Sequence, residues 1–127
     1  MVIILFFEFD NETPLYRQIA EQIEEGIFTG VFPAESQVPS TTEISRQFNI
    51  NPATVLKGMN QLVENGLIEK KRGRGMFVTK MAQDQITTKR QAEFNDHYVE
   101  TFIKEAQKLK LTKAELIALI ERSYDNE

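Results

Sequence analysis

The sequence of 127 residues lacks cysteine and contains one histidine, His97. Without cysteine, disulfide scaffolds, thiolate metal sites and cysteine nucleophiles are excluded. His97 lies beside Asp96 and Glu100, but a lone histidine on a helix is usually just exposed, so we expect no metal site. The carboxylates are scattered, Ser40 has no neighbouring base, and no phosphate-binding loop is present. The sequence therefore predicts neither an enzyme nor a cofactor.

Long hydrophobic runs are also lacking. The most apolar stretch, Val2–Phe9, contains Glu8 and is far shorter than the roughly 18 residues of a membrane helix. It has neither the basic region nor the cleavage site of a secretory signal. We therefore expect a cytoplasmic protein with no membrane partner. The β-branched and aromatic residues of the stretch fit a short strand or arm that another element covers, with a partner subunit as one candidate.

An excess of positive charge is the third absence. The chain has 15 Lys and Arg against 19 Asp and Glu, a net charge of −4, whereas nucleic-acid binders are usually basic. The distribution of charge changes this picture. Residues 38–80 hold seven bases and three acids, a net of +4, between flanks of −6 (residues 1–37) and −2 (residues 81–127). The basic segment is the place to look for a nucleic-acid site.

Local signals predict three helices before residue 66. The first begins with Thr13 as N-cap and Pro14 as first helical residue, and it ends at Gly30. Ser40 and Glu43 have capping-box spacing and open a second helix that ends near Asn49. The apolar stripe of the first helix is Leu15, Ile19, Ile23 and Ile27, and Ile44 and Phe48 supply the buried face of the second.

The third helix begins at Asn51 and Pro52, and Gly66 caps its end. Its expected buried face consists of Val55, Met59, Leu62 and Val63. Gly58 lies inside this helix, where it marks either a close approach of another element or a tolerant surface position.

Two short β-like runs, Leu67–Lys71 and Met76–Thr79, flank the sequence Arg72-Gly73-Arg74-Gly75, whose glycines suit a hairpin turn. Three helices followed by a basic hairpin predict a winged helix-turn-helix over residues 1–80, with an N-terminal arm over residues 1–11. The fold class is mainly α with a small β-hairpin wing.

Residues 81–127 predict a different structure. Ile86, Phe94, Tyr98, Phe102, Ala106 and Leu109 form one stripe of a long helix, and a capping box at Thr112 and Glu115 opens a shorter one. A two-helix hairpin of about 45 residues is near the lower size limit for an independent core. We therefore expect a C-terminal dimerisation hairpin whose contact residues are Phe94, Tyr98, Phe102, Leu109, Leu116 and Ile120.

In a helix-turn-helix the second helix crosses the DNA backbone and the third enters the major groove. Helix N-termini offer backbone N–H groups to phosphate, and arginines of a wing suit the minor groove. The candidate DNA-binding residues are Ser40, Thr41, Thr42, Asn51, Ala53, Thr54, Lys57, Lys71, Arg72, Gly73, Arg74 and Gly75. Asn60 and Gln61 share the exposed face of the third helix but are read as solvated polar residues.

The stretch from Gly30 to Val78 resembles the DNA-binding domain of GntR-type bacterial transcription regulators. The matching positions are Gly30, Pro33, Pro39, Ser40, Thr54, Val55, Gly73, Gly75, Phe77 and Val78. The segment from Pro14 to Ile19 is similar to the family's first helix, and the short C-terminal tail resembles the YtrA subfamily, which dimerises through two helices. The resemblance implies that Ser40, Thr54, Lys57 and Gly73–Gly75 contact DNA. Thr42 departs from it, because the family usually has arginine there.

These observations predict a homodimeric, sequence-specific transcription regulator that binds a palindromic double-stranded DNA operator, with repression as the expected mode. Recognition helices of a dimer would lie about 34–36 Å apart. The alternative is a winged-helix adaptor that binds proteins and not DNA, which explains the basic hairpin poorly. A small-molecule effector between the C-terminal hairpins is left open.

Overall fold

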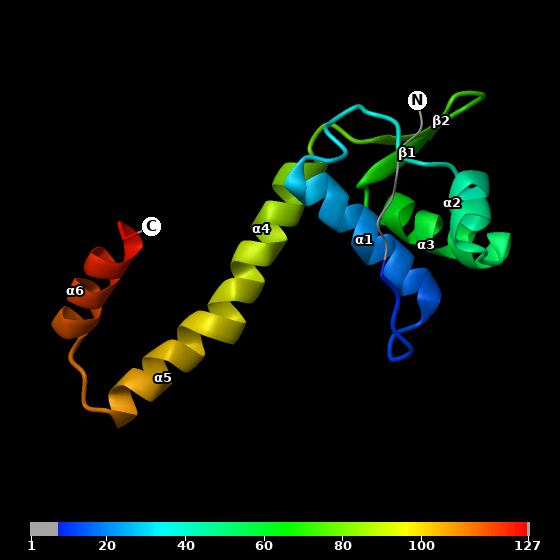
Figure 1. The fold of residues 1–127 in the computed structure, drawn as a ribbon. Helices are drawn as coiled ribbons and strands as arrows, with labels where there is room; N and C mark the ends of the chain where they lie inside the picture. Colours follow the sequence, from blue (N-terminus) through cyan, green and yellow to red (C-terminus); the bar gives the residue numbers. More distant parts are fainter. Residues whose placement is uncertain (1–7, 127) are drawn as a thin grey trace. The chain divides into compact units, whose positions relative to one another are not determined.

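The computed structural model describes residues 8–126 and has the order α1 (Leu15–Thr29), α2 (Thr41–Phe48), α3 (Pro52–Glu64), β1 (Ile68–Lys71), β2 (Gly75–Val78), α4 (Ala82–Phe94), η1 (Asn95–Val99), α5 (Glu100–Lys108) and α6 (Lys113–Tyr124) (Figure 1). The described chain divides into two compact units, residues 8–87 and 88–126. Within residues 8–126, no helix is long and apolar enough to cross a membrane. The architecture is the expected one, helical with a two-stranded antiparallel hairpin.

The beginning of α1 differs from the prediction by one residue. Pro14 is the N-cap and Leu15 is the first helical residue, and no side chain caps the helix. Thr13 is not the cap because its backbone is held elsewhere: its N–H donates to Asp10 Oδ1 (3.2 Å) and its carbonyl accepts from Gln18 Nε2 (2.6 Å). Gly30, with φ of 87°, ends the helix as expected.

The buried side chain of Gln18 fastens the segment before α1 to the helix. Its oxygen accepts from the Asp10 N–H at 2.8 Å, and its Nε2 also donates to the Asp10 carbonyl at 3.0 Å. Phe9 packs edge-on against Phe48 of α2, with ring centroids 5.6 Å apart. Phe9 is therefore half-buried against its own chain, while Val2–Phe7 of the predicted arm lie outside the described residues.

The caps of α2 and α3 are confirmed. Ser40 Oγ accepts from the Glu43 N–H (3.1 Å) while the Glu43 carboxylate accepts from the Ser40 N–H (3.4 Å), which is a complete capping box. Asn49 ends α2 in the left-handed conformation. The Asn51 side chain accepts from the Ala53 N–H at 2.9 Å, with Pro52 in the first turn. Both helix starts are therefore specified by residues within a few positions of them.

The core of residues 8–87 lies where α1, α2 and α3 meet the hairpin. Its fully buried members include Ile19, Ile23, Ile27, Ile44, Val55, Met59, Leu62, Ile68 and Val78. The expectation that Val63 belongs to this face is wrong, because its side chain is 37 % exposed. Val63 follows Leu62 by about 100° around the helix, which places it at the edge of the stripe. Ala82 and Ile86 of α4 complete the core.

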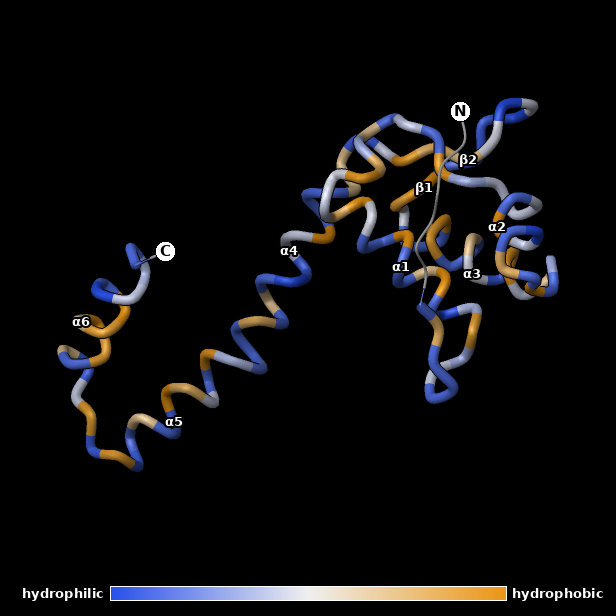
Figure 2. Tube along the Cα trace, viewed as in Figure 1, coloured by the Kyte–Doolittle hydropathy of each residue, from blue (hydrophilic) through white to orange (hydrophobic). Residues whose placement is uncertain are grey.

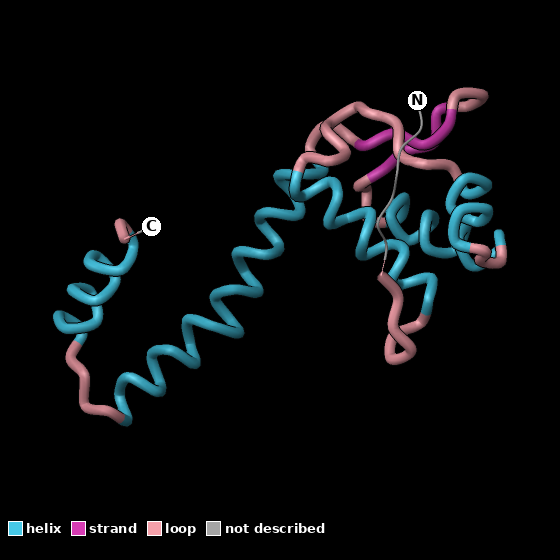
Figure 3. Tube along the Cα trace, viewed as in Figure 1, coloured by secondary structure: helices cyan, strands magenta, loops and turns pink. Residues whose placement is uncertain are grey.

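The wing is the antiparallel pair β1–β2, in register from Ile68 opposite Val78 to Lys71 opposite Gly75 (Figure 3). Gly73 and Gly75 have φ values of 74° and 122°, which only glycine adopts without strain. The segment before α2 joins the other edge of β2, since the Val38 N–H donates to the Met76 carbonyl at 2.9 Å. The start of the helix-turn-helix is thereby tied to the wing.

The C-terminal unit has the expected helices with one difference. Instead of one continuous α-helix, a π-helical turn, η1, separates α4 from α5. Residues four positions apart in an α-helix differ by about 40° around the helix axis, so an apolar stripe with that spacing gradually rotates around the helix. A π turn contains more residues per turn and reduces this rotation. The rings of Phe94 and Tyr98, four positions apart at this turn, lie 5.5 Å apart. The capping box of Thr112 and Glu115 at the start of α6 is confirmed.

Candidate nucleic-acid interface

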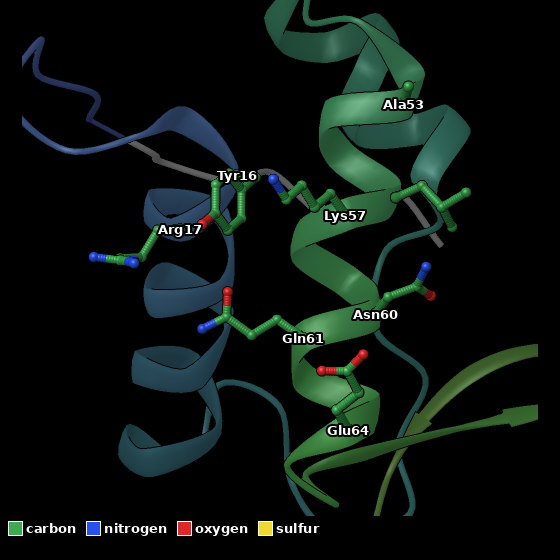
Figure 4. Close-up of a pocket in the computed structure, with 8 residues that line it drawn as sticks. Tyr16, Arg17, Ala53, Lys57, Asn60, Gln61 and Glu64 are labelled. Carbon is green, nitrogen blue, oxygen red and sulfur yellow. The ribbon is translucent and has the colours of Figure 1, made fainter.

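The face of α3 that turns away from the core is open. Ala53, Leu56, Lys57 and Asn60 are exposed there, while Thr54 and Gln61 are half-buried. Apart from Thr54, which lies outside it, these residues line an open hollow of about 550 Å³, and Glu64 with two residues of α1, Tyr16 and Arg17, completes the lining (Figure 4). The hollow shows that the surface offered by α3 continues onto the first turn of α1.

Lys57 has a fixed neighbour in this hollow. Its Nζ lies 4.1 Å from the centroid of the Tyr16 ring, a cation–π distance. Figure 4 shows the Lys57 side chain running from α3 toward the Tyr16 ring on α1. The cation of α3 therefore lies over an aromatic ring of α1.

The N-termini of α2 and α3 supply a second set of groups. Backbone N–H groups in the first turn of a helix have no partner inside the helix and attract anions. Of the predicted residues here, Ser40 and Thr41 are half-buried, and Thr42 and Asn51 are exposed. Both Ser40 and Asn51 already use a side-chain oxygen to cap their own helix. Their predicted contacts with DNA therefore fall to the backbone and to the neighbouring hydroxyl groups.

The wing carries its bases around one aromatic ring. Lys71 Nζ lies 4.7 Å, and the central guanidinium carbon of Arg74 5.3 Å, from the centroid of the Phe77 ring. Arg72, Gly73 and Arg74 are exposed at the tip, and Gly75 is half-buried. A cation over a ring keeps its full charge, so the wing presents positive charge held in place on a hairpin.

None of these bases is neutralised nearby. Among residues 8–126, Lys57, Lys71, Arg72 and Arg74 form no ion pair with a carboxylate, whereas Lys108 pairs with Glu105 at 3.0 Å in α5. The positive charges of the candidate surface thus have no carboxylate partner, and a polyanion such as DNA would be attracted to them.

The structure adds three residues that sequence reasoning did not assign to the site. Tyr16 and Arg17 join it through the packing of α1 on α3. Arg17 carried a signal, because it is the one base among residues 1–37. Gln37 supports the wing: its Nε2 donates to the Arg74 carbonyl at 3.0 Å. Gln37 and Arg74 are 37 positions apart, and nothing local indicated the contact.

Three helices and a hairpin wing, with one face of the third helix exposed, define a winged helix-turn-helix protein. Residues 15–78 match the sequence model of the bacterial regulatory proteins of the gntR family. The chain belongs to this family and is a DNA-binding transcription regulator.

Individual relatives agree with this assignment. The chain is 28% identical over 110 residues to the uncharacterized regulator YhcF of Bacillus subtilis, across 87% of this chain and 89% of YhcF. It is 34% identical over 73 residues to the transcriptional repressor YtrA of the same organism, across 58% of this chain and 56% of YtrA.

Solved structures agree as well. A GntR family regulator from Listeria monocytogenes superimposes with a TM-score of 0.67 at 28% identity, over 90% of this chain and 98% of the other. The DNA-binding domain of AraR in complex with its operator superimposes with a TM-score of 0.52 at 26% identity, over 62% and 95%. The similarity to the Listeria regulator extends beyond the winged helix-turn-helix, whereas the similarity to AraR is confined to about that part of the chain.

Proposed function

We propose that this chain is a homodimeric repressor of the YtrA type that binds a palindromic DNA operator in the cytoplasm. The observation that carries the proposal is the set of unpaired cations, Lys57 on α3 and the bases of the wing, within a segment of net charge +4. Two similarities support it: YtrA is a repressor, and the AraR domain of the same fold binds an operator.

The third helix reads the major groove in this proposal. Ala53 and Thr54, in its first turn, offer methyl groups to thymine, and the Thr54 hydroxyl can donate to a phosphate. Lys57, one turn further along, reaches a guanine edge or a phosphate. The first-turn N–H groups of α2 and α3, together with Thr41 and Thr42, bind phosphates of the DNA backbone. Contacts to phosphate set the register, while Thr54 and Lys57 supply sequence preference.

The wing lies along the neighbouring groove. Lys71, Arg72 and Arg74 bind phosphates or enter the minor groove, and Gly73 and Gly75 let the hairpin backbone approach closely. Because the hydrogen bond from Gln37 to Arg74 links the wing to the start of the helix-turn-helix, the two parts would bind as one body.

Residues 1–80, with the arm over residues 1–11, form the proposed DNA-binding domain, and residues 81–127 form the proposed dimerisation segment. Since Ala82 and Ile86 at the start of this segment are buried in the core of residues 8–87, the proposed dimer contacts fall to residues 88–126. Among residues 88–126 only Ala106 is buried, whereas Phe94, Tyr98, Phe102, Ile103, Leu109, Ile117, Ile120 and Tyr124 are exposed. Figure 2 shows hydrophobic positions recurring along α5 and α6. A helical pair with so little core of its own needs a partner, and a second copy offers the same apolar face.

Selection of sequences from random duplex DNA tests the function. We expect a palindrome whose half-sites are centred about one helical turn apart. The variant Lys57→Ala/Arg72→Ala should weaken binding to it about 100-fold or more, because a dimer loses four cationic contacts. The melting temperature should fall by only a few degrees, since both side chains lie outside the core and Lys57→Ala removes one exposed cation–π contact.

Lys113→Ala/Arg122→Ala removes the same charge from exposed positions of α6 and is the matched control. Because α6 belongs to the proposed dimerisation segment, its dimerisation is first compared with that of the parent by analytical ultracentrifugation, and an equally dimeric control should bind with affinity close to that of the parent. Equal affinities of the two double variants would refute the assigned surface. Failure of the parent protein to enrich any DNA sequence would favour the adaptor instead.

A further inference from the structure

The contact between Tyr16 and Lys57 joins two helices at the surface proposed to read DNA. Lysine has a flexible stem of four carbons, and its ammonium group is free to sample many positions when nothing holds it. Here Nζ lies 4.1 Å from the ring centroid of Tyr16. The ring restricts where the charge of Lys57 stands before any ligand arrives.

An aromatic ring holds a lysine differently from a carboxylate. A carboxylate would cancel the charge, and the pair would have to separate before Lys57 could bind DNA. The face of a ring attracts the ammonium through its quadrupole and leaves the net charge in place. No carboxylate among residues 8–126 forms an ion pair with Lys57. The arrangement orders the side chain without neutralising it.

The ring itself is placed by backbone packing one residue away from Lys57. A Cβ atom at Gly58 would lie 2.6 Å from the Tyr16 carbonyl oxygen and 3.4 Å from Ile19 Cβ. Glycine therefore allows α1 and α3 to approach at the level of Tyr16. The position of the ring relative to Lys57 follows from the contact between the helices and does not depend on the tyrosine hydroxyl group.

We propose that Tyr16 is a positioning residue, whose ring holds the Lys57 ammonium at the DNA-reading edge of α3 and so increases affinity for the operator. The inference rests on the proposed function of Lys57 and adds a role for α1. Ordering a lysine before binding lowers the entropy lost on binding, which is the general advantage of preorganisation. The ring is required, whereas the hydroxyl group is not.

The size of the effect follows from the strength of an exposed cation–π contact. Such a contact shifts an equilibrium about two- to fivefold. Each protomer of the dimer loses this factor at its own half-site, so the two losses multiply. Tyr16→Leu should therefore weaken operator binding by the dimer about 4- to 25-fold. Tyr16→Phe keeps the ring and should bind within about twofold of the parent.

A double-mutant cycle on the selected operator tests the proposal. The dissociation constants of Tyr16→Leu, Tyr16→Phe, Lys57→Ala and Tyr16→Leu/Lys57→Ala are measured by fluorescence anisotropy, and thermal unfolding is recorded for each variant. In the proposal, Tyr16→Leu has no effect once Lys57 is absent, so the double variant binds as weakly as Lys57→Ala and no more weakly. If Tyr16→Leu acted only through lost packing, it would weaken operator binding by the same factor with Lys57 present and with Lys57→Ala.

Three results would overturn the inference: full affinity in Tyr16→Leu, additive losses in the double variant, or a Tyr16→Phe variant as weak as Tyr16→Leu. The last result would indicate a direct contact of the hydroxyl group with phosphate. Full affinity in Lys57→Ala would instead contradict the proposed role of Lys57 itself, so the two failures are distinguishable.

Discussion

Gly58 in the middle of α3 provides the sharpest test of how α1 packs against α3 in the winged helix-turn-helix. Replacing an exposed helical glycine by alanine stabilises a helix by about 1 kcal/mol. At Gly58 the added Cβ would stand 2.6 Å from the Tyr16 carbonyl oxygen, whereas ordinary contacts begin at 3.4 Å. The atom it meets belongs to the backbone, so no side-chain rotation relieves the clash. Helices α1 and α3 must separate by about 0.8 Å, the difference between these distances.

The magnitude follows from two opposing effects. Overpacking of a tightly packed contact costs typically about 1–3 kcal/mol, and the gain in helix propensity returns about 1 kcal/mol. We expect Gly58→Ala to be destabilised by about 1 kcal/mol. For a domain of this size that corresponds to a melting temperature lower by roughly 4–8 °C.

Thermal and urea unfolding followed by circular dichroism measure this change. Asn60→Ala is the matched control, because Asn60 is exposed on the same helix and gains propensity without meeting a backbone. It should be neutral or slightly more stable than the parent. If Gly58→Ala were more stable than the parent, by an amount similar to Asn60→Ala, the close approach of α1 and α3 would be refuted.

Other substitutions test separate parts of the molecule. Ser40→Ala removes one half of the capping box and should cost about 0.5–2 kcal/mol in urea unfolding; an unchanged midpoint would contradict it. Gln37→Ala frees the Arg74 carbonyl and should lower the free energy of unfolding by about 0.5–1.5 kcal/mol, the net value of one hydrogen bond, and weaken operator binding several-fold; parental operator affinity would show that this bond does not hold the wing for DNA. Phe102→Glu places a charge on the exposed apolar face of α5 and should give a monomer by analytical ultracentrifugation; a dimer of parental affinity would move the interface elsewhere.

The sequence predicted the fold best where a local interaction specifies the structure. Ser40 with Glu43, Asn51 with Pro52, and Thr112 with Glu115 each act within four residues, and all three helix starts are confirmed. Thr13 was the wrong cap because a residue five positions later competes for its backbone: Gln18 binds the Thr13 carbonyl, and Asp10 binds its N–H.

The parts of the candidate site that the sequence did not predict depend on tertiary contacts. Lys57 was found because it is a base on the exposed face of a helix. Tyr16 was not, because its role arises only when α1 packs against α3 at Gly58. Gln37 reaches the wing across 37 positions, and periodicity carries no information about such a pair. The π turn at Asn95–Val99 is likewise invisible to a pattern that assumes one helical period.

The nearly coreless helical pair of residues 88–126 has a consequence for how the regulator responds in a cell. In the proposed dimer, the same association that buries the apolar face also brings two reading units to one operator. The concentration of dimer then rises with the square of the monomer concentration when monomers prevail. A twofold change in synthesis or degradation becomes about a fourfold change in operator-competent protein. The concentration of the protein alone then controls occupancy of the operator, and occupancy changes more steeply with concentration than it would for a monomeric regulator of equal affinity.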